Sequence, residues 1–533
     1  MTTTPDEGAF APLRERVFAV LWVATVLGNV GSFMRDVASG WLVTELSPHP
    51  AAVAAVQAAA SLPVFLFAIP AGVLADILDR RRFLIAVQCL LAAVSAALML
   101  LSHSGALDLA SLLALTFVGG IGAALMGPTW QAIVPALVPR TQLRSAVALN
   151  SLGVNIARSL GPAAGGVLLA TWGAAVTYGA DLLTYALVIA ALLWWRPTPA
   201  ATDPLAEPFG GALRAGLRHA MANRDLHRVL LRAGLFFAFA SAAWALLPLV
   251  GRQLLQGDAA FYGVMLGAVG SGAIGGALAL PQLRQRLGAD ALLMVAAWLC
   301  AAVMALLALS PPRALALAAL LLLGVAWIVA LTILGSLTQT VLPNWVRGRG
   351  LAVYLTVFNG ALATGSLAWG AIAQGLGLVG TLLLAAATLA VLGVVARRWP
   401  LPAGDEVLDP ALAWPVPELA GAVPGERGPV LVHVEYRVAA GDRPAFEALL
   451  VQLSAHRRGD GASDWGVTED AADPQQLVEW FVLPSWQEHL RQHHRTSQAA
   501  VALQARLHQF HQGPGKPVVR HLLTLRPVPL HQN

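Results

Sequence analysis

Apolar residues dominate the first 400 positions in runs of about 20 to 30 residues, separated by short polar stretches. A helix that crosses the hydrocarbon core of a bilayer needs about 20 apolar residues. The pattern therefore predicts an all-α membrane protein with twelve transmembrane helices. We place these at residues 17–45, 51–75, 83–102, 108–137, 143–171, 173–195, 228–254, 259–282, 288–310, 313–342, 350–375 and 378–397.

The longest polar connection within this block, 196–227, follows the sixth span and divides the helices into two six-helix halves, 1–195 and 228–400. Two halves imply an internal repeat. The sequence QAIVPALVPRTQLRSAVALN at 131–150 is echoed by QTVLPNWVRGRGLAVYLTVFN at 339–359, with Gln, Pro, Val, Arg and Asn in the same order. We therefore predict that both halves share one design.

The pattern changes after residue 400. Residues 401–428 are rich in Pro, Glu and Asp, which predicts a linker. Beyond it, alternating apolar positions predict strands at 430–438, 464–469, 476–483 and 518–525, with helices at 442–457 and 485–511. This order predicts a small cytoplasmic α+β ferredoxin-like domain over 429–528.

The composition also indicates that the chain lies in a lipid bilayer. The 533 residues are 57% hydrophobic and 12% charged, against about 25% charged in soluble proteins. If the N-terminus is cytoplasmic, 19 arginines lie in inner segments and only Arg252 and Arg313 in outer loops. The positive-inside rule then predicts that both termini are cytoplasmic in a multi-pass protein of the inner membrane. Basic charge belongs to the membrane block, so we expect no nucleic-acid partner.

Few residues offer other chemistry. Cys89 and Cys300 stand far apart in apolar runs, so nothing in the sequence suggests a disulfide framework or a CxxC metal site. Lys516 is the sole lysine, and no phosphate-binding loop motif occurs, which excludes direct drive by ATP. We predict no cofactor and no metal.

Two motifs carry a family resemblance. GVLADILDRRRF at 72–83 resembles the signature between spans two and three of the major facilitator superfamily, with Asp79 where that family usually has glycine. ARSLGPAAGG at 157–166 resembles the antiporter motif of exporting members, with Ala157 in place of the first glycine. The chain is most similar to the enterobactin-exporter-like branch over residues 10–400.

The resemblance implies a secondary active transporter, not an enzyme. It would export a small amphipathic molecule, siderophore-like or drug-like, by alternating access, with proton antiport. The gating residues that it implies are Gly72, Asp76, Arg80, Arg81, Gly161, Pro162, Gly165 and Gly166. The arginine that many proton-linked members carry in the fourth span is absent from this sequence.

Four ionisable residues fall within predicted spans, where charge is costly and marks a pathway or a buried pair. They are Arg35, Asp36, Arg158 and Asp181. Counted from the inner ends of their helices, Arg158 and Asp181 both lie roughly 21 to 23 Å along. We therefore predict a pair of Arg158 with Asp181, and with Asp36 as the second choice. A structural ion pair and a coupling site both fit this pattern.

Polar and aromatic residues in the spans are the candidates for a substrate cavity. They are Asn29, Gln57, Trp130, Gln131, Asn155, Trp244, Trp327, Gln339 and Asn359. Each of them also fits a packing role.

The predicted C-terminal domain resembles the antibiotic-biosynthesis monooxygenases, through its strand order and SWQEHLRQHHRTS at 485–497. That resemblance implies a dimerising or regulatory module. His489, His493 and His494 lack cysteine or carboxylate partners in the sequence, so we interpret them as an exposed helix face. Alternatives are a membrane-tethered, cofactor-independent monooxygenase and a transport-inactive scaffold or sensor.

Overall fold

The computed structural model describes residues 10–196, 209–343, 345–402, 421 and 423–524. Contacts divide the chain into two compact units, which we treat separately. The helical unit comprises Met1–Pro204, Leu230–Ser336 and Ala352–Leu401. The mixed unit comprises Leu205–Val229, Leu337–Leu351 and Pro402–Asn533.

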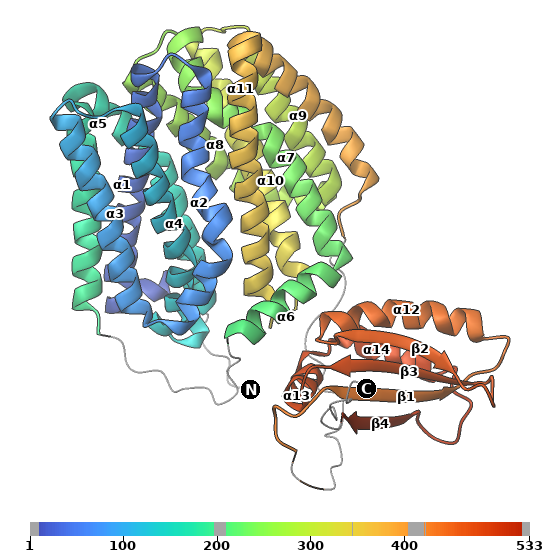
Figure 1. Cartoon of the computed structure of the whole chain (residues 1–533). Coiled ribbons are helices and arrows are strands. Elements are labelled where there is room, and N and C mark those ends of the chain that lie inside the picture. The colour runs from blue at the N-terminus through green and yellow to red at the C-terminus, as the bar shows by residue number, and fades with distance from the viewer. Residues whose placement is uncertain (1–9, 197–208, 344, 403–420, 422, 525–533) are drawn as a thin grey trace, which may run out of the picture. The chain divides into compact units, whose positions relative to one another are not determined.

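Ten helices of the described chain are long and apolar enough to cross a membrane (Figure 1). They are α1 (Arg16–Leu46), α2 (Pro50–Ile77), α3 (Arg80–His103), α4 (Leu109–Leu137), α5 (Leu143–Trp194), α7 (Arg224–Leu249, continued by a π-helical turn Val250–Leu254), α8 (Ala259–Arg286), α9 (Ala289–Ala308), α10 (Arg313–Thr340) and α11 (Arg347–Val395). The prediction of a mostly helical membrane protein is confirmed.

Two of these helices, α5 and α11, are each broken by one glycine. Gly173 has φ 79° and ψ 178°, and Gly377 has φ 71° and ψ 172°, a region that only glycine occupies readily. In both places the glycine carbonyl accepts a hydrogen bond from a threonine four residues later, Thr177 Oγ1 at 3.1 Å and Thr381 Oγ1 at 2.8 Å. The predicted boundaries between spans five and six, and between eleven and twelve, fall beside these glycines.

Acidic residues begin three of the helices. Asp79, Asp108 and Asp258 each accept a hydrogen bond of 2.8 Å from a backbone N–H three residues later. Such caps satisfy donors that a helix start leaves without partners, and a carboxylate also suits the positive end of the helix dipole. Asp79, the departure from the family motif, is therefore the N-cap of α3.

Arg232 ties three helix ends together inside the helical unit. Its Nη1 donates to Asp290 Oδ1 at 2.7 Å, at the start of α9, and to Ala396 O and Trp399 O at 2.8 and 3.1 Å, at the end of α11. The other oxygen of Asp290 accepts from Leu401 N at 3.0 Å. The Arg232 side chain is only 2% exposed, so the charge depends on these partners.

We expect Arg232→Ala to lower the free energy of unfolding by about 2 to 3 kcal/mol, since it removes a buried charged donor, while the remaining Asp290 is 29% exposed and still accepts from Leu401 N. Arg228→Ala is the matched control on the same helix. Its pair with Asp225 at 3.2 Å is 48% and 41% exposed and should contribute at most about 1 kcal/mol. Thermal unfolding of both variants in detergent measures the difference. Equal melting temperatures for the two would contradict the assignment.

The mixed unit contains one antiparallel sheet. Its strands are β1 (Val430–Arg437), β2 (Asp464–Glu469), β3 (Gln476–Leu483) and β4 (Val518–Leu523), in the order β2-β3-β1-β4. Its helices are α6 (Phe209–Ala222), α12 (Arg443–Gly459), α13 (Trp486–Arg495) and α14 (Gln498–His508). Alternate residues of β1, Val430, Val432, Val434 and Tyr436, are buried in a core with Phe446 and Leu453 of α12. The four predicted strands are present.

Two features differ from the sequence expectation. The single helix predicted at 485–511 is two helices, because Thr496 leaves the helical conformation and Ser497 caps α14 by accepting from Ala500 N at 3.2 Å. The connection predicted at 196–227 contains helix α6, which was not predicted because it is too short to count as a span.

Helix α6 packs on the C-terminal part of the mixed unit. Arg218 Nη1 donates to Gly461 O at 2.7 Å, and His219 Nδ1 lies 3.1 Å from Gly459 O. The Arg495 guanidinium lies 4.3 Å from the centre of the Trp345 ring, in the connection between α10 and α11. Residues from three separate parts of the chain thus share one folded unit.

Candidate functional site

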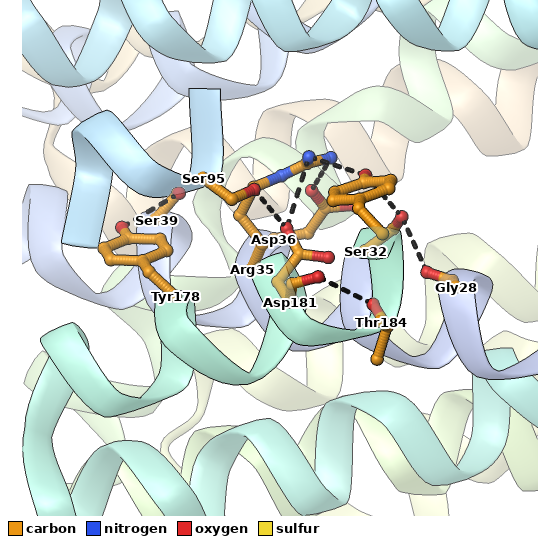
Figure 2. A network of polar contacts seen from close by, with 10 residues as sticks. Gly28, Ser32, Arg35, Asp36, Ser39, Ser95, Tyr178, Asp181 and Thr184 are labelled. Carbon is orange, nitrogen blue, oxygen red and sulfur yellow. Dashed lines mark hydrogen bonds and ion pairs between the residues drawn. The ribbon is translucent and has the colours of Figure 1, made fainter. Parts of the chain in front are cut away.

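A charged cluster lies within the helical unit, between α1 and the second arm of α5 (Figure 2). Arg35 Nη1 is 3.5 Å from Asp181 Oδ2, and Arg35 Nη2 is 3.5 Å from Asp36 Oδ1. The Asp181 side chain is fully buried, whereas that of Asp36 is 61% exposed. One guanidinium therefore bridges a fully buried carboxylate and an exposed one.

Hydroxyl groups complete the cluster. Arg35 Nη1 donates to Tyr185 Oη at 2.9 Å, and Ser32 Oγ lies 2.9 Å from the same oxygen. Ser95 Oγ of α3 donates to Asp181 Oδ2 at 2.7 Å, while Asp181 Oδ1 has no hydrogen-bond partner within the described chain. The buried carboxylate is thus under-satisfied, which is costly in a site of low dielectric constant. The interaction energy of the Asp181 carboxylate therefore changes strongly when it binds a proton or when the Arg35 guanidinium moves.

Asp181 does not pair with Arg158, and that sequence prediction is wrong. Asp181 pairs with Arg35 instead, and the second choice, Asp36, also pairs with Arg35. Among the described residues the Arg158 side chain has no ion pair or side-chain hydrogen bond. The prediction matched depth along the helix axes, but the direction of a side chain around its helix also decides which groups meet.

Same-face spacing identifies the members that the sequence analysis missed. Ser32, Arg35, Asp36 and Ser39 stand at i, i+3, i+4 and i+7 on α1, and Tyr178, Asp181 and Tyr185 at i, i+3 and i+7 on α5. Such spacing places side chains on one helix face. Ser39 Oγ and Tyr178 Oη lie 3.1 Å apart at the edge of the cluster.

The second implied gating motif lines a very close helix crossing. A Cβ on Gly263 of α8 would lie 2.7 Å from both Gly166 Cα and Pro162 O of α5. A Cβ on Gly165 would lie 2.7 Å from Met34 Cα, and one on Gly161 would lie 2.9 Å from Val30 O, both on α1. Small residues thus allow the first arm of α5 to touch α1 and α8 backbone to backbone.

The first implied gating motif ends on an anchored arginine. Arg81 Nε donates to Leu192 O at 2.7 Å and its Nη2 to Leu193 O at 2.8 Å, at the end of α5. Cations suit the carbonyls at a helix C-terminus. Arg80 begins α3 and is exposed. Gly72 and Asp76 belong to α2, but the surroundings of their side chains lie outside the described residues.

The nine candidates for a cavity have different environments. Trp244 and Trp327 pack with ring centres 5.1 Å apart, beside Phe237 and Phe358. The Trp244 indole N–H has no described hydrogen-bond partner and could bind a ligand. Trp130 is instead buried among apolar residues and donates to Asn150 Oδ1 at 2.9 Å.

The polar candidates make local contacts. The Asn155 and Asn359 amides each donate at 2.9 Å to a carbonyl four residues earlier in their helix. Gln131 and Gln339 are exposed, and Asn29 and Gln57 are half-buried. A cavity role for these residues stays a prediction.

A second polar cluster lies in the core of the mixed unit. Arg457 Nε donates to Glu479 Oε1 at 3.0 Å, and the Trp465 indole N–H donates to the same oxygen at 3.1 Å. Tyr436 Oη donates to Glu479 Oε2 at 3.4 Å. Burial, and then the Glu479 charge, raise the pKa of Tyr436. Every oxygen of this carboxylate has a protein partner, which is typical of a structural pair.

Comparisons with known proteins cover different shares of the chain. The family model described as transmembrane secretion effector matches residues 7–528, so its match includes the C-terminal sheet. The staphyloferrin A transporter of Staphylococcus aureus is 24% identical over 262 residues, 49% of this chain and 65% of that protein. The enterobactin exporter of Salmonella typhimurium is 29% identical over 293 residues, 54% and 68% of the two chains. The multidrug efflux pump Tap of Mycobacterium bovis is 24% identical over 400 residues, 73% and 94%. The chain thus spans about two thirds of the first two relatives.

Solved structures share the helical fold. The nucleoside transporter NupG superposes with a TM-score of 0.59 at 14% identity, over 72% of this chain and all of that one. A bacterial homologue of the lysosomal transporter Spinster, in an inward-facing and unoccupied conformation, gives 0.56 at 16% identity, over 73% and 96% of the two chains. At these identities the likeness concerns the fold alone.

Proposed function

Since the chain belongs to the transmembrane secretion effector family of the major facilitator superfamily, we propose that it is a secondary transporter of the inner membrane. It exports a small amphipathic molecule from the cytoplasm by alternating access, coupled to proton antiport. The names of its relatives, two siderophore transporters and a multidrug efflux pump, support export of a siderophore-like or drug-like molecule.

The proposed topology has twelve spans in two halves of six. The breaks at Gly173 and Gly377 support it, because each divides a helix of about 50 residues into two segments of spanning length. The arginine asymmetry supports cytoplasmic placement of both termini. Repetition of the Gly-x-x-x-Thr contact in α5 and α11 supports a shared design of the halves.

The bridge formed by Arg35 is the observation that carries the coupling proposal. In the proposed cycle, Asp36 takes a proton from the aqueous side, which weakens its hold on Arg35. The guanidinium then pairs more closely with Asp181, and α1 moves against α5. Loss of the proton reverses this shift. Arg158 stays a candidate for coupling through contact with the substrate.

The crossing of α5 and α8 is the proposed gate. Pro162 and Gly166 of the antiporter-like motif lie there against Gly263 with no side chain between the backbones. Helices without interlocking side chains can separate and close again along a defined surface. Opening at this crossing would give the substrate access to the other side of the membrane.

The C-terminal part of the mixed unit is proposed to be a ferredoxin-like accessory domain that dimerises, not an enzyme. Its strand order with intervening helices supports the fold. Leu431, Trp480, Val482 and Leu522 are register neighbours that lie on the sheet face opposite to the buried Val430 and Val432. This face is the proposed contact with a second copy of the chain.

Inverted membrane vesicles test the proposed function. Vesicles that contain the full chain should accumulate enterobactin or a radiolabelled macrolide when respiration acidifies their interior, and a protonophore should abolish the accumulation. Vesicles without the protein are the control. Equal accumulation in both preparations for both probes would overturn the proposal, and accumulation only in right-side-out vesicles would indicate uptake. Substrate oxidation by the purified full chain would favour the monooxygenase alternative.

A further inference from the structure

Three histidines from two elements of the mixed unit meet beside its sheet. His489 and His493 stand four residues apart on α13 and therefore share one face of that helix. His521 lies on β4, where it is the register partner of Val432 on β1. Paired residues of neighbouring strands point to the same side of a sheet, and Val432 is buried in the core. His521 consequently faces the helices.

The imidazoles are close enough to share one ion. One ligand nitrogen from each of the three histidines can be chosen so that all lie within 4.8 Å of one another. The ring centre of His489 is 4.6 Å from that of His493 and 4.7 Å from that of His521. In a tetrahedral zinc site with Zn–N bonds of about 2.0 to 2.1 Å, ligand nitrogens are roughly 3.3 Å apart. Small side-chain rotations would bring the three nitrogens to that separation.

His489 is buried with little hydrogen bonding from the protein. Its side chain is 1% exposed, and neither ring nitrogen makes a hydrogen bond of regular geometry within the described chain, although the Gln492 amide interacts with it. The neighbouring Gln492 is also buried, and both polar atoms of its amide likewise lack a described hydrogen bond of regular geometry. Buried polar groups are normally hydrogen-bonded, and each orphan costs about 1 to 3 kcal/mol. An unsatisfied imidazole aimed at two others therefore points to an absent ligand.

A metal ion binds the neutral form of an imidazole, through the lone pair of a ring nitrogen. Arg457, a buried cation of the same core, is neutralised by its pair with Glu479, so it opposes a dication only weakly.

We propose that His489, His493 and His521 bind one Zn²⁺ ion, with water as the fourth ligand. Imidazole is a preferred ligand of zinc, and three histidines with an open position form a known kind of zinc site. His493 and His521 are half-buried, which leaves a route from the solvent. The ion would join α13 to β4, two elements that the sequence separates by more than 20 residues. It would thereby stabilise the end of the C-terminal fold independently of transport.

Metal analysis of the full chain in detergent tests this site. The protein is purified through a tag that contains no histidine, stripped with a chelator and dialysed against micromolar Zn²⁺. We expect one zinc per chain by mass spectrometry, a higher melting temperature with zinc, and visible absorption of tetrahedral Co²⁺ after substitution. His493→Ala and His521→Ala should each weaken zinc binding at least about 10- to 100-fold, the loss that removal of an outer-shell partner alone causes.

His433→Ala is the matched control, because His433 lies on β1 directly after Val432 and so on the opposite face of the sheet. It should bind zinc as the unchanged protein does. Circular dichroism verifies that each variant folds. If an alanine variant does not fold, zinc binding is measured with His493→Gln instead. Absence of bound zinc in the unchanged protein would overturn the proposal. So would zinc binding by the His493 and His521 variants that is as tight as in the unchanged protein. Neither result depends on whether the chain exports a substrate.

Discussion

Arg35→Ala should reduce export of the macrolide or enterobactin probe at least about tenfold and lower the free energy of unfolding by about 3 to 5 kcal/mol. The reason is that Arg35 is the cation beside the fully buried Asp181, whose other described partner is the Ser95 hydroxyl. Without the guanidinium, that carboxylate either stays charged in a dry site or takes up a proton permanently. Vesicle transport and thermal unfolding in detergent measure the two effects.

A double variant distinguishes a coupling role from a structural one. Arg35→Ala combined with Asp181→Ala should recover much of the stability, because no unpaired buried charge remains. Export should stay lost if the pair couples protons. Normal, proton-dependent export by the double variant would reduce the cluster to a structural pair. Arg158→Ala serves as the control for stability, since this arginine has no described ion pair and its loss should change unfolding little.

Gly263→Val should abolish export while the protein still inserts into the membrane. The first carbon of the new side chain would lie 2.7 Å from backbone atoms of Gly166 and Pro162, which cannot move aside as a flexible side chain can. Overpacking of this kind costs about 1 to 3 kcal/mol and would hold α5 and α8 apart. The proposed gate could then not close.

Gly275 lies on the same helix and provides the matched control. A Cβ at that position meets no atom within 4 Å, so Gly275→Ala should leave export unchanged. Comparison at equal membrane abundance, measured by immunoblot, separates gating from expression. Normal export by Gly263→Val would contradict the role of the α5 and α8 crossing.

The helices could be predicted because a bilayer imposes a length on apolar runs, and the strands because their apolar residues alternate. The partners of charged residues could not be predicted to the same degree. The depth of a residue along a helix follows from its position in the sequence. The direction in which the Arg158 side chain points depends on how α5 packs against α1 and α8. Spacing on α1 and α5 could have added Tyr185 and Tyr178 to the cluster.

The histidine cluster shows a second limit of prediction from the sequence. His489 and His493 were visible as a pair on one predicted helix, but His521 lies on a strand whose register with β1 decides which face it occupies. A shift of one residue would turn it to the other side of the sheet. Similarly, α6 is too short to be recognised as a span, and the residues that it contacts, Gly459 and Gly461, lie far away in the sequence.

The glycine breaks in α5 and α11 also allow the two halves to be compared position by position. Thirty residues lead from Leu143, where α5 begins, to Gly173, and thirty lead from Arg347, where α11 begins, to Gly377. At 1.5 Å per residue, both first arms are about 45 Å long. Gly161 and Gly166 stand twelve and seven residues before the break of α5, and Gly365 and Gly370 stand at the same distances before the break of α11. Glycines at the places that α5 uses for its close helix contacts are therefore present in both halves.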